Sequence, residues 1–146
     1  MSETVLNSGD TAWMLMSCAL VLLMTPGLAL FYGGMVRAKG VLNMMMMSFI
    51  SMGIVSVLWV LYGYSMAFGK DLGGGLLGDP FQMFGLTKEI APDSFFGTIP
   101  TSVFIAFQAM FAIITVALIS GAIADRTKFG GWIVFVIVWS TVVYFP

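Results

Sequence analysis

Four long stretches of this 146-residue sequence contain no charged residue, and this feature restricts the fold more than any other. They cover residues 11–36, 40–69, 94–124 and 129–146. A helix of about 20 apolar residues crosses a hydrocarbon core of about 30 Å. Only 9% of the residues are charged, whereas a soluble domain has about a quarter. The sequence therefore predicts an all-α integral membrane protein, and it argues against a soluble domain, a disordered chain or a nucleic-acid-binding protein.

The four stretches predict four transmembrane helices, at approximately 12–32, 41–68, 100–124 and 129–146. The first is not expected to be a signal peptide, because the acidic Glu3 and Asp10 precede it and its apolar run is too long. Asp10 or Thr11 is the expected N-cap, and Pro26 predicts a break. The fourth stretch is still apolar when the sequence stops. We therefore interpret residues 1–146 as the N-terminal part of a single domain that is truncated at its C-terminus.

Basic residues in the connecting segments predict the orientation in the membrane. Arg37 and Lys39 follow the first stretch, and Arg126 and Lys128 follow the third. The segment 70–93 contains two lysines but also four acids, spread over a longer loop. Short cytoplasmic loops are enriched in Lys and Arg. We therefore expect a multi-pass protein of the cell membrane with its N-terminus outside.

The sequence offers little material for metal binding or acid–base catalysis. It has no histidine, its acids all lie in tails or loops, and its single cysteine is Cys18. A zinc, di-iron or histidine-based site inside the membrane is therefore not expected, and neither is a cofactor. Ser48, Ser51 and Ser56 have no basic partner within their stretch, which disfavours a membrane enzyme.

One helical face of the 100–124 stretch combines aromatic and polar side chains. The residues with this spacing are Phe104, Phe107, Gln108, Phe111, Thr115 and Leu118. Packing is one interpretation, with Gln108 hydrogen-bonded to a neighbouring helix. The other is an aromatic-lined conduit, because phenyl faces attract cations by about 0.5–2 kcal/mol each.

A second candidate face lies on the first helix and consists of Leu28, Phe31 and Tyr32. Packing is again the alternative, with Tyr32 as an interfacial anchor. The spacing Ala117-x-x-x-Gly121 is expected to allow close helix packing. The run Met44–Met47 spreads around a helix, so we interpret it as adaptable apolar packing rather than a copper path.

Several blocks of the sequence resemble one family. Met24–Arg37 closely resembles the end of the first helix of ammonium transporters of the Amt branch of the Amt/Mep/Rhesus family. Further blocks resemble the second helix, the third helix and the turn that follows it, in the same order. These blocks are Trp59–Gly69, Ala106–Thr115 and Gly121–Arg126. One departure is Lys39-Gly40, where many members have Lys-Asn.

The resemblance implies an eleven-helix channel with its N-terminus outside, usually a homotrimer with one pore per subunit. Such channels recruit ammonium at an aromatic outer vestibule and pass neutral ammonia through a hydrophobic pore gated by stacked phenylalanines. By resemblance, Phe107 corresponds to a vestibule aromatic, Phe111 to the upper gate ring and Gln108 to the polar residue beside them. The implied pore wall consists of Leu28, Phe31, Tyr32, Thr115 and Leu118.

The implied partners are ammonium or ammonia, the lipid bilayer, further copies of the chain and a cytosolic regulatory protein. The family's vestibule Trp, second gate Phe and paired pore histidines correspond to positions beyond Pro146. A transport-inactive membrane fragment that serves as an interaction piece is therefore the alternative function.

Overall fold

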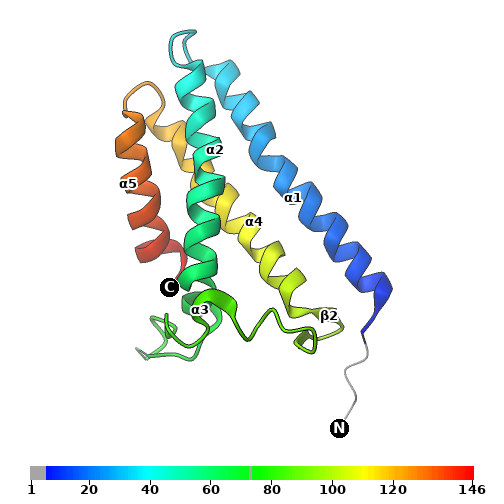
Figure 1. The fold of residues 1–146 in the computed structure, drawn as a ribbon. Coiled ribbons are helices and arrows are strands. Elements are labelled where there is room, and N and C mark those ends of the chain that lie inside the picture. Colours follow the sequence, from blue (N-terminus) through cyan, green and yellow to red (C-terminus); the bar gives the residue numbers. More distant parts are fainter. Residues whose placement is uncertain (1–5, 73) are drawn as a thin grey trace.

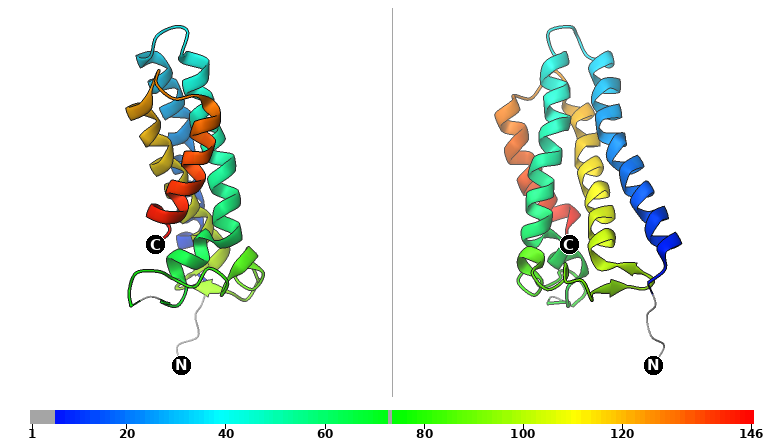
Figure 2. Two further views of the ribbon diagram at one scale, coloured as in Figure 1. Left: turned by 90° about the vertical axis from the view of Figure 1, so that its left-hand side faces the viewer. Right: turned by 45° about the vertical axis from the view of Figure 1, so that its right-hand side comes forward.

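Helical rods that pack side by side form most of the molecule (Figure 1). The computed structural model describes residues 6–72 and 74–146, so Glu3 lies outside the described residues. The longest α-helices are α1 (Ser8–Met35), α2 (Val41–Leu58), α4 (Thr101–Ile119) and α5 (Phe129–Trp139). Consecutive rods run in opposite directions, and α1 lies beside both α2 and α4 (Figures 1 and 2).

Three of these rods extend beyond their α-helical part. α2 continues through a π-helical turn, η1 (Trp59–Gly63), into the short helix α3 (Tyr64–Phe68). α4 ends in a 3₁₀ turn, η3 (Ser120–Ile123). α5 ends in a second π-helical turn, η4 (Ser140–Tyr144). The rods Ser8–Met35, Val41–Phe68 and Thr101–Ile123 are long and apolar enough to cross a membrane, and Phe129–Tyr144 is a shorter apolar segment.

The first helix differs from its predicted bounds of 12–32. α1 begins four residues earlier because Asn7, and neither Asp10 nor Thr11, caps it. The Asn7 side-chain oxygen accepts hydrogen bonds from the backbone N–H groups of Gly9 and Asp10, at 2.9 and 3.2 Å. Such a cap satisfies donors that have no partner inside the helix. Pro26 lies within the continuous α1 helix, so the predicted break is not an interruption of the helix.

Two tryptophans attach α2 to its neighbours. The indole nitrogen of Trp59 donates to the Ile105 carbonyl oxygen of α4 at 3.2 Å, and that of Trp132 donates to the Met47 carbonyl oxygen of α2 at 2.9 Å. Met44 and Met47 are 2% and 1% exposed. The methionine run therefore contributes two of its members to the core, in agreement with the packing interpretation.

The two ends of the bundle differ in their connections. The short loops 36–40 and 124–128 lie together at one end, which we call the basic end (Figures 1 and 2). The opposite end, which we call the loop end, carries residues 69–72 and 74–100. There a 3₁₀ turn, η2 (Phe84–Leu86), precedes an antiparallel hairpin of β1 (Phe95–Phe96) and β2 (Ile99–Pro100). The Asn7 N–H donates to the Thr98 carbonyl oxygen at 3.0 Å, which fixes the start of α1 against this hairpin.

Candidate functional site

An apolar groove between α1 and α4 contains several of the predicted pore residues. Its volume is about 320 Å³. The residues that line it are Met24, Gly27, Leu28, Phe31, Ile114 and Leu118. Phe31 is 63% exposed and Leu118 49% exposed, so the described residues form only one wall. The groove has no charged residue, which suits a neutral or weakly polar solute better than an ion.

Sequence reasoning missed three of the lining residues. Met24, Gly27 and Ile114 contribute to the groove in addition to Leu28, Phe31 and Leu118. The place of Gly27 could have been predicted from helical spacing, because it lies one turn before Phe31 on the same helical face. A Cβ atom at Gly27 would meet no other atom within 4 Å, so this glycine widens the groove rather than enabling a close helix contact.

The aromatic pair lies on α4, nearer the loop end than Leu118. The ring centroids of Phe107 and Phe111 are 5.0 Å apart, and the ring planes meet at 78°. This edge-to-face arrangement is a favourable one for two phenyl rings. Phe107 is half-buried, and Phe111 is 36% exposed. The two rings therefore share one side of α4, and the Phe111 ring is the more exposed of the two.

The two polar residues on this face of α4, Gln108 and Thr115, differ in their hydrogen bonds. The Thr115 hydroxyl donates to the Phe111 carbonyl oxygen at 2.7 Å, so its hydrogen bond stays within its own helix. Gln108 is half-buried, and within residues 6–72 and 74–146 its amide has no hydrogen-bond partner. The interhelical hydrogen bond of the packing interpretation is therefore not present among the described residues.

Tyr32 occupies a different place from the one its sequence neighbours suggested. Its hydroxyl donates to the Leu118 carbonyl oxygen at 2.9 Å. Its ring lies against Gly121, where a Cβ atom would come within 2.8 Å of the ring carbon Cζ. Tyr32 lines a separate cavity of about 150 Å³ together with Gly121 and Met44. Tyr32 therefore lies outside the lining of the α1–α4 groove, and Gly121 makes room for its aromatic ring.

Comparison with known proteins identifies the family. A model of the Ammonium Transporter Family matches residues 12–146. The chain belongs to the ammonium transporter family. It is 59% identical, over 96% of its length, to the ammonium transporter of Mycobacterium tuberculosis. It is 50% identical, over 97% of its length, to the protein named as a putative ammonium transporter of Methanothermobacter thermautotrophicus.

Solved structures of the family share the fold. Candida albicans Mep2 superposes on 97% of the chain with a TM-score of 0.83 and 33% identity, and Saccharomyces cerevisiae Mep2 with 0.84 and 30%. The chain spans about a third of the length of the curated relatives it matches, 32% for the Mycobacterium tuberculosis protein. The family and the apolar helices together make this a multi-pass membrane protein, and the relatives are named as transporters rather than enzymes.

Proposed function

We propose that this chain supplies one wall of an ammonium-transporting pore. In this proposal Phe107, Gln108 and Phe111 form part of the outer vestibule and gate, and the α1–α4 groove forms the pore wall beneath them. The observation that carries the proposal is the open apolar groove with Phe111 toward its outer side, in a chain of this family. Thr115 and Leu118 continue the wall, and Tyr32 marks its inner limit.

The chemistry of the groove supports passage of neutral ammonia. Burial of an ammonium ion in a low-dielectric site costs several kcal/mol even after relaxation. One or two cation–π contacts from Phe107 and Phe111 offset part of this cost, at about 0.5–2 kcal/mol each. No carboxylate lies in the groove lining. The ion is therefore recruited at the aromatic pair and releases its proton to the external water before the neutral molecule enters the groove.

The orientation and assembly belong to the same proposal. The basic end carries four basic residues and one acid in its two short loops, which favours a cytoplasmic location. The N-terminus is then outside. The open side of the groove requires further helices to enclose a pore, and the relatives are about three times as long as this chain. Homotrimer formation and binding of a cytosolic regulator follow the family pattern.

A fusion experiment tests the proposal. Residues 1–146 replace the matching third of the Mycobacterium tuberculosis relative, and a transporter-deficient strain is grown on limiting ammonium at low pH. We expect the fusion to restore growth and methylammonium uptake, because the groove regains its missing wall. Phe31→Trp is expected to fill the groove and lower uptake per purified protein. Leu30→Trp is the matched control, since Leu30 is 66% exposed and outside the groove lining.

Two outcomes would contradict the proposal. If Phe31→Trp lowers protein yield while uptake per molecule stays constant, Phe31 only packs. The second outcome concerns the chain by itself, which we expect to be inactive because it presents a single wall. Growth rescue by residues 1–146 alone, abolished by Phe111→Asp, would show that copies of the chain assemble a pore without further helices.

A further inference from the structure

The half of α1 nearer the loop end makes little contact with the core. The buried residues of α1 are Thr25, Ala29 and Gly33, and all three lie in the half nearer the basic end. Every residue in the range 8–24, which we call the α1 arm, is at least partly exposed. Segments with few buried contacts have low local stability. Packing within the described residues therefore does little to fix the direction of the α1 arm.

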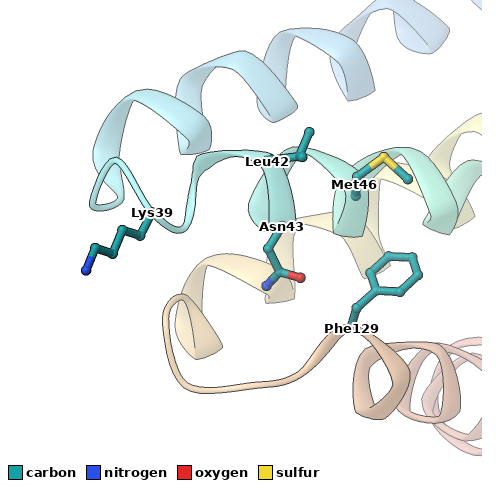
Figure 3. Close-up of a pocket in the computed structure, with 5 residues that line it drawn as sticks. All are labelled: Lys39, Leu42, Asn43, Met46 and Phe129. Carbon is teal, nitrogen blue, oxygen red and sulfur yellow. The ribbon is translucent and has the colours of Figure 1, made fainter.

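Helix α5 shows how a surface helix of this bundle is held by packing. At the basic end, a surface hollow of about 360 Å³ lies between α2 and α5, and Asn43 and Phe129 are among the residues that line it (Figure 3). In the core, however, Trp132 is 0% exposed and its indole nitrogen donates to the Met47 carbonyl oxygen at 2.9 Å. The α1 arm has no buried side chain of this kind, so its position depends on other contacts.

The β1–β2 hairpin supplies contacts to the free end of the α1 arm. The hairpin lies between the loop-end termini of α1 and α4 (Figure 2), and β2 contacts both helices. The Asn7 N–H donates to the Thr98 carbonyl oxygen at 3.0 Å, and the Thr98 hydroxyl donates to the Asp10 carboxylate at 2.5 Å. A hydroxyl–carboxylate bond is about twice as strong as a neutral one. Thr98 therefore holds both the cap and the first turn of α1.

The other side of the hairpin is attached to α4. The Phe96 ring stacks on the Phe104 ring, with centroids 3.9 Å apart and planes at 12°. The Thr101 N–H donates to the Ser94 carbonyl oxygen at 3.0 Å, and the Ser94 hydroxyl donates to the Thr101 hydroxyl oxygen at 2.8 Å. The hairpin is thus fixed to α4, and through Thr98 it connects α4 to the first turn of α1.

Pro26 lies where the α1 arm meets the packed half of the helix. Proline has no N–H, so the carbonyl oxygen of Leu22 lacks its usual helical donor. Helices bend most readily at such positions. Met24 and Leu28 lie on either side of Pro26, and both line the α1–α4 groove. A tilt of the α1 arm about Pro26 therefore moves Met24 relative to α4 and changes the width of the groove.

We propose that the β1–β2 hairpin is a latch that positions the α1 arm. The latch consists of Thr98 and Asp10, the pivot is Pro26, and the latched arm sets the width of the α1–α4 groove at Met24. Thr98 and Asp10 are positioning residues, because they act on the groove through α1. The consequence for transport rests on the proposed function of the groove, whereas the direction of the α1 arm does not.

Distances between two spin labels, measured by double electron–electron resonance on the 146-residue chain in detergent, test the latch. In a Cys18→Ala background, Leu15→Cys/Val138→Cys reports on the α1 arm, and Leu30→Cys/Val138→Cys reports on the packed half. The three labelled positions are 54%, 55% and 66% exposed for Leu15, Val138 and Leu30. We expect Thr98→Val to broaden the first distribution and raise the unlatched fraction about two- to ten-fold, the factor that one exposed hydrogen bond contributes. The second distribution should keep its width.

Conservative variants separate the latch from a general loss of structure. Thr98→Ser keeps the hydroxyl and should keep the narrow distribution. Asp10→Ala removes the acceptor and should act like Thr98→Val, whereas Asp10→Asn keeps an acceptor oxygen and should not. Pro26→Ala restores a helical N–H and should reduce the broadening caused by Thr98→Val. Circular dichroism checks the helical content of each variant, and if Thr98→Val loses it, the comparison of Asp10→Ala with Asp10→Asn decides.

The fusion with the longer relative tests the consequence for transport. Thr98→Val should lower methylammonium uptake per purified molecule about two- to ten-fold, in proportion to the latched fraction, and Thr98→Ser should leave it unchanged. A fusion that transports equally well with Thr98→Val would remove the positioning role. A fusion that does not transport even without a substitution would contradict the proposed function instead, and the label distances would still decide the latch.

Three results of the distance measurements would overturn the proposal. Unchanged widths in both Thr98→Val and Asp10→Ala would show that the hairpin does not hold the α1 arm. Equal broadening for the label pairs at Leu15 and Leu30 would show a general loosening of α1. Equal broadening by Thr98→Val with and without Pro26→Ala would show that the α1 arm does not pivot at Pro26.

Discussion

The contact between Tyr32 and Gly121 offers a quantitative test of how α1 and α4 are held together. In Gly121→Ala the new methyl group would lie 2.8 Å from the Tyr32 Cζ atom, which is too close for two carbon atoms. The ring must therefore move. A cavity of about 150 Å³ beside Tyr32 can accept it, but the hydroxyl then leaves the Leu118 carbonyl oxygen, which it now reaches at 2.9 Å.

The expected loss of stability is the sum of two modest effects. A hydrogen bond of this type contributes about 0.6–1.5 kcal/mol, and the remaining strain of an overpacked site is about 1 kcal/mol. Gly121→Ala should therefore lower the free energy of unfolding by about 1.6–2.5 kcal/mol. Gly34→Ala has no neighbour within 4 Å and should leave it unchanged or raise it by up to about 1 kcal/mol.

Unfolding of the detergent-solubilised chain by added dodecyl sulfate, followed by circular dichroism, measures these values. A double-mutant cycle isolates the contact, because in Tyr32→Ala the methyl group at position 121 meets no ring. We expect Gly121→Ala to cost less than about 0.5 kcal/mol in that background. An equal cost in both backgrounds would refute the reasoning and would assign the effect to the backbone of η3. Tyr32→Phe, which keeps the ring, should lose only the hydrogen-bond contribution.

Two further predictions concern the loop end. At Gly63 a Cβ atom would lie 2.7 Å from Phe145 Cζ, and Phe145 is 1% exposed. Gly63→Ala should therefore lower the free energy of unfolding by about 1–3 kcal/mol in the same assay. A loss no larger than that of Gly34→Ala would contradict this prediction. Leu76→Cys in a Cys18→Ala background should react with an impermeant maleimide from outside intact cells, since Leu76 is 77% exposed; reaction only after the cells are opened would reverse the proposed orientation.

The long helices could be predicted from the sequence because charges mark their ends. The rod Val41–Phe68 has the bounds predicted for it, and Thr101–Ile123 differs from its prediction by one residue at each end. The start of α1 was missed because hydropathy is insensitive to a capping side chain, and Asn7 lies outside the apolar run. The π-helical turns could not be predicted either. They depend on tertiary packing, in which Phe145 of the segment after η4 lies against Gly63 of η1.

The candidate site was predicted in part for a similar physical reason. Leu28, Phe31 and Leu118 lie together in the groove because apolar residues at helical spacing share a face. Tyr32 departs from this pattern because its hydroxyl needs an acceptor in an apolar environment and finds the Leu118 carbonyl oxygen. Thr115 satisfies the same requirement within α4. The positions of polar side chains depend on their hydrogen-bond partners, and residue spacing alone does not identify those partners.

The distribution of charge differs between the two ends of the helix bundle. The segment 70–93 at the loop end contains four acids and two lysines, and Asp10 lies nearby at the start of α1. A negative field at this end raises the local concentration of a cation, next to the aromatic pair Phe107 and Phe111. The basic end has the opposite sign, with four basic residues and one acid in its two short loops. In the proposed function, an ammonium ion would therefore meet a favourable field at the end where the proposed pore begins.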